Sequence, residues 1–511
     1  MRRRLATFAI RLGLAFAGVA LFCGYALAPA FSFLPYLAVV PWVILYTDPK
    51  RPRASSLYFL FAGCLCWMIC YRVTARFGWF VPPVMALFFT PAWILFPLIM
   101  KPVQRLGLPR SVSLPIVWVA VEWARVLLAT SHFDLFALGY SQARFVPLIQ
   151  IADVTGVYGL SFLVAAVNGW LADLWFAWRD ESWRFRLAWR RRRLRAGAWS
   201  IATAFTVVVL YGYVRLATFS VSEGPRLAVV QSNSTHDAIA AGGADLIVWP
   251  ENPVPDGIDR QGASRDELAP LAARMRCWIL LGAQGWADTT PGGTTNSAFL
   301  LDETGTARGR YDKQILFPFA EYVPLDGAVG AVAPSVQRSY RALIRNAWGS
   351  LPMGTRGTRM TSFELPFRGG ALPFAVLLGV ENTYPPLVAD AARRGARFFV
   401  NISNEGEVGG TLREQLMRVS ILRAVENRVA YVRAGNSGIP GFIDPQGRVS
   451  APGELAAPVA LSPVGATPYA TSRDGFALLC VAAALLLLAR GLLRGGPTTM
   501  TPIPAHAATA A

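Results

Sequence analysis

The sequence predicts a polytopic α-helical membrane domain of seven spans plus one C-terminal span, with an α/β domain inserted before the last span. Two observations predict this class. First, 54% of the 511 residues are hydrophobic, which is too apolar for a soluble domain of this length. Second, eight apolar runs are each near the length that crosses a hydrocarbon core of about 30 Å. They lie at 12–28, 31–46, 55–71, 79–100, 112–129, 157–178, 198–214 and 476–493.

The net charge of +18 is concentrated in short segments next to alternate ends of these runs. Short loops rich in Lys and Arg stay on the cytoplasmic side of a membrane. Both termini are therefore expected in the cytoplasm, and the insert Ser220–Pro468 on the opposite side. The cluster Arg190–Arg193 lies beside two apolar runs, which favours contact with anionic lipid over nucleic-acid binding. We expect no nucleic-acid partner.

Cysteine and histidine usage limits the chemistry of the insert. Five cysteines lie in the apolar runs, and Cys277 is the single cysteine of the insert, which excludes an internal disulfide there. The three histidines His132, His236 and His506 are far apart in sequence. The sequence therefore predicts no metal site and no cofactor.

Short β-rich apolar runs recur through the insert, and several are separated by stretches with apolar residues at helical spacing. Runs that are apolar throughout, such as Ala375–Leu378, predict sheets buried on both faces. Tyr384–Arg394 and Thr411–Arg428 predict helices, and Gly395 predicts a helix end. This alternation predicts a layered α/β domain. The expected strands are 226–231, 244–249, 278–282, 297–301, 374–378, 397–401 and 429–433.

Four charged residues occupy informative places in this pattern. Glu251 and Glu381 each follow a buried strand, where α/β sheets place their chemistry, and Lys313 and Glu321 lie eight residues apart. Together they could supply a general base, a cation that stabilises an oxyanion, and carboxylates that keep the lysine charged. Taken singly, each also fits an exposed surface charge.

A series of short motifs extends in order along nearly the whole chain. The motifs are Val-Glu-Trp-Ala-Arg at 121–125, Leu-Gly-Tyr-Ser-Gln at 138–142, Gly-Val-Tyr-Gly-Leu-Ser-Phe at 156–162, Val-Trp-Pro-Glu at 248–251, Glu-Tyr-Val-Pro at 321–324, Asn-Ile-Ser-Asn at 401–404, Arg-Ala-Val-Glu at 423–426, Asn-Ser-Gly-Ile at 436–439 and Thr-Pro-Tyr at 467–469. Through these motifs and the eight apolar runs, the chain resembles the apolipoprotein N-acyltransferase family of the nitrilase superfamily.

The resemblance implies an α-β-β-α sandwich resting on the spans, in the bacterial inner membrane with the insert in the periplasm. It implies transfer of a fatty acyl chain from a phospholipid donor to the N-terminal amine of a diacylglyceryl-modified lipoprotein, by way of a cysteine thioester. By position, Glu251 matches the family's general base and Lys313 its oxyanion-stabilising lysine. Glu321 and Glu381 match its supporting carboxylates.

The family's nucleophilic cysteine lies two residues before the glutamate that matches Glu381, and this chain has Gly379 there. A thiolate is the nucleophile of thioester chemistry, and Cys277 does not substitute because it enters a different strand, where we expect it to pack as a small apolar residue. Three hypotheses follow. The chain is a family member that transfers acyl groups without the usual thiol, a non-catalytic relative that binds phospholipid or lipoprotein, or a carbon–nitrogen hydrolase with another substrate.

The expected domains are a seven-helix membrane domain at 1–219, the periplasmic domain at 220–468, the last membrane helix at 469–496 and a disordered cytoplasmic tail at 497–511. Glu122 and Arg125 lie at i and i+3 in the fifth apolar run. They either contact a substrate headgroup or form an internal ion pair.

Overall fold

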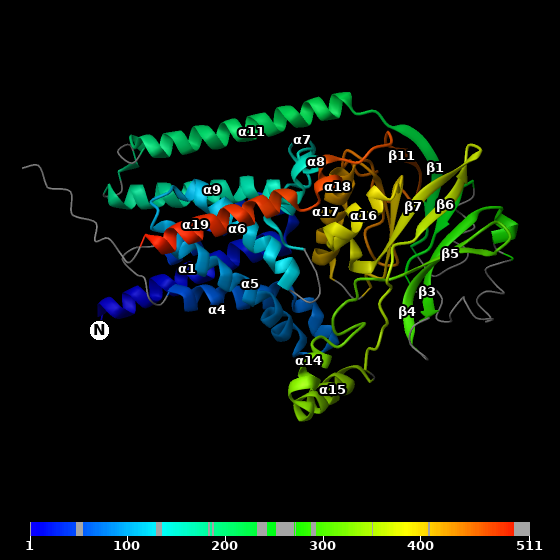
Figure 1. Cartoon of the computed structure of the whole chain (residues 1–511), viewed down its shortest axis with the longest axis horizontal. Coiled ribbons are helices and arrows are strands. Elements are labelled where there is room, and N and C mark those ends of the chain that lie inside the picture. The colour runs from blue at the N-terminus through cyan, green and yellow to red at the C-terminus, as the bar shows by residue number, and fades with distance from the viewer. Residues whose placement is uncertain are drawn as a thin grey trace, which may run out of the picture.

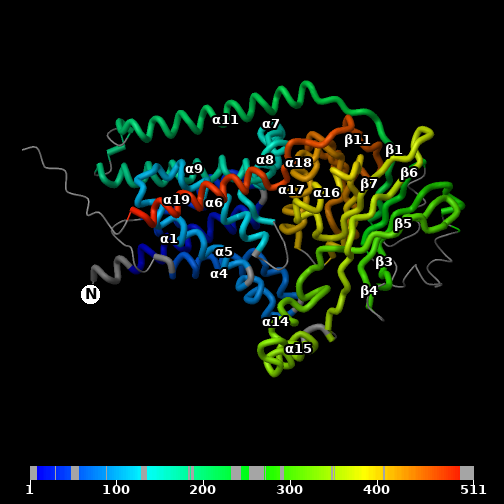
Figure 2. Tube along the Cα trace, in the orientation of Figure 1, coloured from blue at the N-terminus to red at the C-terminus, as the bar shows by residue number. Residues whose placement is uncertain are grey.

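The computed structural model describes residues 2–47, 55–128, 135–181, 184–185, 189–231, 243–251, 270, 272–287, 293–349, 351–406 and 409–494. The coloured tube of Figure 2 follows the chain through these parts. The three histidines and the expected tail at 497–511 lie outside the described residues.

Each apolar run forms helix over most of its described residues. The corresponding helices are α1 (Arg2–Leu27), α2 (Pro35–Ala38) with α3 (Val40–Thr47), α4 (Ser55–Cys70), α5 (Val81–Gln104), α6 (Arg110–Leu128), α9 (Val157–Asp180), α11 (Arg192–Thr218) and α19 (Gly475–Leu493). The C-terminal helix α19 returns to the bundle and contacts α5 and α6, whereas α11 lies along its edge beside α9 (Figure 1).

The second apolar run differs from the prediction because it is not one continuous helix. It divides into α2 and α3 at Val39. Pro41 has no N–H to donate to the carbonyl of Leu37, so the helical ladder is interrupted at this point. Five described helices are long and apolar enough to cross a membrane, namely Phe8–Leu27 within α1, α5, α9, α11 and α19. The total of eight spans stays a prediction.

The insert contains two sheets packed face to face. The first has the strand order β11-β1-β2-β3-β4-β5, and the second has the order β10-β9-β8-β7-β6. The neighbours β1, β2 and β3 run parallel, as do β7, β8 and β9. The strands are β1 (Ser222–Val229), β2 (Leu246–Val248), β3 (Trp278–Trp286), β4 (Thr294–Leu301), β5 (Ala307–Asp312), β6 (Ser362–Phe367), β7 (Gly370–Leu378), β8 (Phe398–Ser403), β9 (Ala430–Gly435), β10 (Gly441–Ile443) and β11 (Ala456–Leu461).

All seven expected strands are confirmed, and so are both expected helices, α16 (Pro385–Arg393) and α17 (Gly410–Asn427). Gly395 follows α16 with φ +95°, a left-handed conformation that ends the helix. In β2, Leu246 and Val248 belong to the core shared with the second sheet, whereas Ile247 belongs to a separate core on the other face. The first sheet is therefore buried on both faces, as expected from its apolar runs.

Helices α16 and α17 lie between the second sheet and the helix bundle (Figure 1). They connect the parallel strands β7, β8 and β9 in turn. The chain enters the sandwich from α11 through β1 and leaves it through β11 toward α18 (Pro468–Ser472) and α19 (Figure 2). A helical pair, α14 (Asp326–Val332) and α15 (Pro334–Trp348), projects beside the sandwich (Figure 1).

The sandwich is tied to the bundle by buried charges from the end of α17. The carboxylate of Glu426 accepts a hydrogen bond of 2.8 Å from the N–H of Val157, at the start of α9. The guanidinium of Arg428 lies 2.7 Å from the carboxylate of Asp153. Three of the motifs found in the sequence therefore meet here, since Tyr469 also packs against the glycine that precedes Val157.

Within the bundle, Glu122 is held by internal hydrogen bonds. Its Oε1 accepts from the indole N–H of Trp118 at 2.8 Å and from the N–H of Leu138 at 2.9 Å. The guanidinium of Arg125 lies over the ring of Trp67, 5.1 Å from its centre. These contacts favour an internal structural role for Glu122 and Arg125 over contact with a substrate headgroup.

Candidate active site

The four charged residues singled out in the sequence converge at one place between the two sheets. Glu251 follows β2 and Lys313 follows β5, so both come from the first sheet. Glu381 lies in the short 3-10 helix Gly379–Thr383 that follows β7 of the second sheet. Glu251, Lys313 and Glu381 are buried, and Glu321 is partly buried. The reading of each residue as an exposed surface charge is therefore wrong.

Lys313 is the cation at the centre of this group. Its Nζ lies 2.8 Å from Oε1 of Glu321 and 3.3 Å from Oε1 of Glu251. Burial by itself lowers the pKa of Lys313, but the two carboxylates outweigh burial and raise the pKa above its ordinary value. For the carboxyl group of Glu321, burial acts in the opposite direction and raises the pKa. The charge of Lys313 outweighs burial and brings the pKa of Glu321 below its ordinary value. The lysine and Glu321 are therefore both charged at neutral pH.

Glu251 is oriented by donors from three different segments. Its Oε1 accepts from the side-chain amide of Asn296 and from Lys313, and its Oε2 accepts from the N–H of Asn404 at 2.8 Å. The amide of Asn296 also donates to Glu321 at 2.8 Å. A carboxylate held in this way has a fixed orientation and can still accept a proton from a group placed beside Oε2.

Glu381 connects the two sheets. Its carboxylate accepts hydrogen bonds from the N–H groups of Gln314 and Ile315, directly after Lys313, and from the N–H of Leu378. The hydroxyl of Tyr311 donates to it as well, at 2.9 Å. Burial raises the pKa of Glu381 to about 7, against the opposing effect of these N–H donors. Glu381 therefore positions the segments that carry Lys313 and Gly379.

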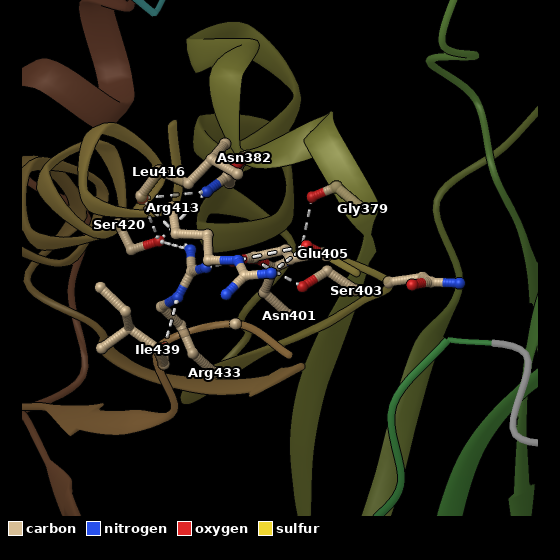
Figure 3. Close-up of polar contacts among 12 residues, drawn as sticks. Gly379, Asn382, Asn401, Ser403, Glu405, Arg413, Leu416, Ser420, Arg433 and Ile439 are labelled. Carbon is tan, nitrogen blue, oxygen red and sulfur yellow. Dashed lines mark hydrogen bonds and ion pairs between the residues drawn. The ribbon is translucent and has the colours of Figure 1, made fainter. Parts of the chain in front are cut away.

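Gly379 faces the charged group at close range. A Cβ added to Gly379 would lie 2.9 Å from Nζ of Lys313 and 3.2 Å from Oε2 of Glu251. The backbone has φ +53°, in the left-handed region that favours glycine. The amide of Asn401 donates to the carbonyl of Gly379 at 3.1 Å and holds the turn in place (Figure 3).

A second buried network lies behind this turn, between the second sheet and α17 (Figure 3). It is centred on the ion pair of Glu405 and Arg433, both almost fully buried. The guanidinium of Arg433 also donates to the hydroxyl of Ser420 at 2.9 Å and to the carbonyl of Leu416 at 3.2 Å. Ser403 donates to Glu405 at 2.9 Å. The sequence reasoning did not include this network.

Three polar residues of the site were also missed by sequence reasoning: Asn296, Tyr311 and Asn401. Asn401 begins one of the motifs and follows a run of apolar strand residues, so a polar residue within a buried strand was a usable signal. Asn296 and Tyr311 lie in strands with several polar neighbours and gave no such signal.

Cys277 is not part of the site. It is buried in the separate outer core of the first sheet, with Ile247 and Ile279. Burial raises the pKa of its thiol to about 11, so the thiolate form is disfavoured. This placement confirms the expectation that Cys277 packs as a small apolar residue.

A cavity of about 320 Å³ lies where the helix bundle meets the loop before α17. Arg72 and Arg76 line it from the short 3-10 helix Arg72–Phe77, and Gly409 and Thr411 line it from the sandwich. The guanidinium of Arg76 donates to the carbonyl of Gly406, two residues after Asn404. The cavity thus adjoins the loop that orients Glu251.

Sequence comparisons agree with the two-part architecture. Residues 17–170 match the apolipoprotein N-acyltransferase N-terminal domain, and residues 214–457 match the carbon-nitrogen hydrolase family. The apolipoprotein N-acyltransferase of Geobacter metallireducens is 29% identical, over 91% of this chain and 92% of that protein. Apolipoprotein N-acyltransferase 2 of Treponema pallidum is 27% identical, over 90% of each chain. An amidase from Nesterenkonia sp. is similar to 50% of this chain and 96% of its own, with 19% identity and a TM-score of 0.34.

Residues 214–457, which match the carbon-nitrogen hydrolase family, form the paired sheets that hold the buried Glu–Lys–Glu group. The chain therefore contains a domain of the nitrilase superfamily joined to a helical bundle. The helical bundle matches the N-terminal domain of apolipoprotein N-acyltransferases, and the two relatives match along nearly the whole chain. The chain therefore belongs to the apolipoprotein N-acyltransferase family.

Proposed function

We propose that this chain binds the donor and acceptor of lipoprotein N-acyl transfer, a phospholipid and a diacylated lipoprotein, at a site that has lost the thioester route. The observation that carries the proposal is the position of Gly379, where an added Cβ would lie next to Lys313 and Glu251. A side chain at 379 would lie between a base and a cation, where a nucleophile is activated. Glycine offers no nucleophile there, and loss of a catalytic nucleophile costs on the order of 10⁶ in rate.

The cavity at the junction supports the lipid part of this proposal. Arg72 and Arg76 would place two cations beside a phospholipid headgroup, and planar guanidinium groups suit phosphate oxygens. We further propose that the sandwich lies on the periplasmic side of a bacterial inner membrane and that the domains follow the boundaries 1–219, 220–468 and 469–496. The alternation of Lys and Arg along the sequence supports this topology.

A second candidate function is direct transfer without a covalent intermediate, and the retention of Glu251 and Lys313 in contact favours it. In this route the lipoprotein amine attacks the ester carbonyl of the phospholipid, and Glu251 accepts the amine proton. Lys313 stabilises the oxyanion, the ester C–O bond breaks, and the proton passes to the departing lysophospholipid oxygen. Glu321 keeps Lys313 charged, and Glu381 positions its segment.

Acyl transfer by the purified full-length protein tests these proposals. The protein is mixed with phospholipid and a diacylated lipopeptide, and the triacylated product is measured by mass spectrometry. The variants are Gly379→Cys, Glu251→Ala and Gly379→Ala, the last being the matched control for the added Cβ without a thiol. We expect lipopeptide binding but no product from the unaltered chain, and product with an acyl-thioester adduct from Gly379→Cys alone.

The other outcomes discriminate between the hypotheses. Product from the unaltered chain that disappears in Glu251→Ala would establish direct transfer and reject the binding-only function. Absence of both lipopeptide binding and product would reject both functions for this site. A Gly379→Cys variant that folds and binds lipopeptide but forms no thioester would show that more than the nucleophile has changed.

A further inference from the structure

Three cysteine thiols meet inside the helix bundle, at a place that the acyl-transfer site does not use. Cys23 comes from α1, and Cys66 and Cys70 lie one turn apart on the facing side of α4. The Sγ of Cys23 lies 3.6 Å from that of Cys66 and 4.0 Å from that of Cys70. All three sulfurs lie within 4.8 Å of one another, and all three residues are buried. Within the described residues, no other group of three His, Cys, Asp or Glu side chains meets in this way.

These distances match those of a metal thiolate centre. A metal–sulfur bond of about 2.3 Å places sulfurs about 3.8 Å apart in a tetrahedral site and about 4.0 Å apart in a trigonal one. The thiols of Cys23, Cys66 and Cys70 could therefore bind one ion after small side-chain shifts. The i, i+4 spacing on α4 fixes two of the ligands on one rigid element, which favours a preformed site.

The surroundings supply a charge and a route for the ion. Arg72 begins the short 3-10 helix Arg72–Phe77, two residues after Cys70. Cys70 and Arg72 also line the cavity of about 320 Å³ at the junction, so an ion entering this cavity reaches the cluster directly. Metal sites require such an entry path.

We infer that Cys23, Cys66 and Cys70 form a binding site for a thiophilic d¹⁰ cation, Zn²⁺. Each thiol that binds releases its proton to water in the cavity as the metal–sulfur bond forms. The two charges of Zn²⁺ neutralise two of the three thiolate charges, and a larger net charge in an apolar bundle would be costly. A water molecule from the cavity can complete the tetrahedron. A thiolate-only set also binds Cu⁺, but Cu⁺ would leave one more thiolate charge without a balancing charge than Zn²⁺ does.

The competing explanation is that three small, polarisable side chains simply pack together. Metal binding by the full-length protein in detergent distinguishes the two. The protein is reduced, freed of metal with a chelator, and titrated with Zn²⁺ against a chromophoric competitor, and the bound metal is counted by mass spectrometry. The test variants are Cys70→Ala and Cys23→Ala. The matched control is Cys64→Ala, which lies on the same helix two residues from Cys66 and outside the cluster.

We expect one Zn²⁺ per chain for the unaltered protein and for Cys64→Ala, with affinity at least about 100-fold weaker in Cys70→Ala and Cys23→Ala. Bound Cd²⁺ should show the ultraviolet thiolate charge-transfer band only in the unaltered protein and in Cys64→Ala. Size-exclusion profiles of the metal-free variants check that each is folded. If Cys70→Ala does not fold, Cys70→Ser replaces it as the test variant. No stoichiometric metal, or equal binding in all variants, would overturn the site. Stoichiometric Cu⁺ without Zn²⁺ would overturn the assignment to Zn²⁺.

Discussion

Two buried ion clusters meet at the end of β8 and the two residues that follow it, Asn404 and Glu405, and they differ in how their charges are matched. In the first cluster, one carboxylate, Glu405, faces one guanidinium, Arg433. In the second cluster, a single Lys313 serves two carboxylates, Glu251 and Glu321. The N–H of Asn404 donates to Glu251, so the balanced pair anchors the main chain that orients the unbalanced group. The comparison separates a structural ion pair from a site with a carboxylate available for chemistry.

The largest expected effect comes from breaking the balanced pair. In Arg433→Met, Glu405 stays buried without its cation, and we expect a loss of about 3–5 kcal/mol in stability. Thermal unfolding of the full-length protein measures this loss. The control Arg394→Met removes an exposed partner of Asp390, for which less than about 1 kcal/mol is expected. Equal effects of the two variants would contradict the structural role of the Glu405–Arg433 pair.

Removing the cation of the unbalanced cluster should give a loss that depends on pH. In Lys313→Met, Glu251 and Glu321 lose their shared partner, so the pKa of Glu321 is no longer held below its usual value of 4.5. In the unaltered protein, the stabilisation from Glu321 is present above pH 4.5 and is lost as pH falls through its lowered pKa. We expect the variant to lose about 3 kcal/mol at pH 7 and much less at pH 4. Melting temperatures of both proteins across this pH range measure the difference in stability. A difference that does not change with pH would refute the ion pair of Lys313 with Glu321 as its cause.

Glu381 should show the opposite pH dependence, because its pKa is raised to about 7 from 4.5. The folded state then holds a proton that the unfolded state releases, so stability falls as pH rises from 4.5 to 7. This decline should amount to about 2 to 3 kcal/mol and be missing from Glu381→Gln. The difference between the two stability curves isolates it from the contribution of Glu321. Parallel curves would show that Glu381 stays ionised throughout.

The smallest effect is expected at Gly379. Gly379→Ala places a Cβ at φ +53° and against Nζ of Lys313, and the left-handed conformation alone costs about 1–2 kcal/mol. Gly369→Ala is the matched control, since Gly369 has φ +77° with open space around the added Cβ. The excess loss in Gly379→Ala over Gly369→Ala measures the contact with Lys313. No excess would mean that the lysine moves aside freely, and room for a side chain would then exist.

The sequence predicted Glu251 and Glu381 because they follow strongly apolar strands, whereas Lys313 and Glu321 were matched through the family resemblance. It missed the polar residues of weaker strands. The strand β5 carries mainly polar residues that are exposed or half-buried, and β6 carries Pro366 at a sheet edge, so neither gave an apolar signal. Arg433 was detectable in principle, because a charge within the apolar strand Ala430–Gly435 requires a buried partner. Its partner Glu405 lies in a loop, and only the packing of the fold brings the two together.

The same limit applies to the helix bundle. The spacing of Cys66 and Cys70 is visible in the sequence, but Cys23 joins them only through the packing of α1 on α4. The break between α2 and α3 had a visible cause in Pro41, yet an apolar run of this length conceals it from hydropathy alone.

The hydrogen bond from Val157 to Glu426 and the ion pair of Arg428 with Asp153 make the two parts of the chain dependent on each other. A soluble fragment cut at residues 220 and 468 would keep the ion pair of Glu426 with Arg423 but would carry Arg428 without the carboxylate of Asp153. Such a fragment would expose a charged, formerly buried surface and lose stability accordingly. The sandwich of this protein is thus a poor candidate for excision and is best handled together with its helices.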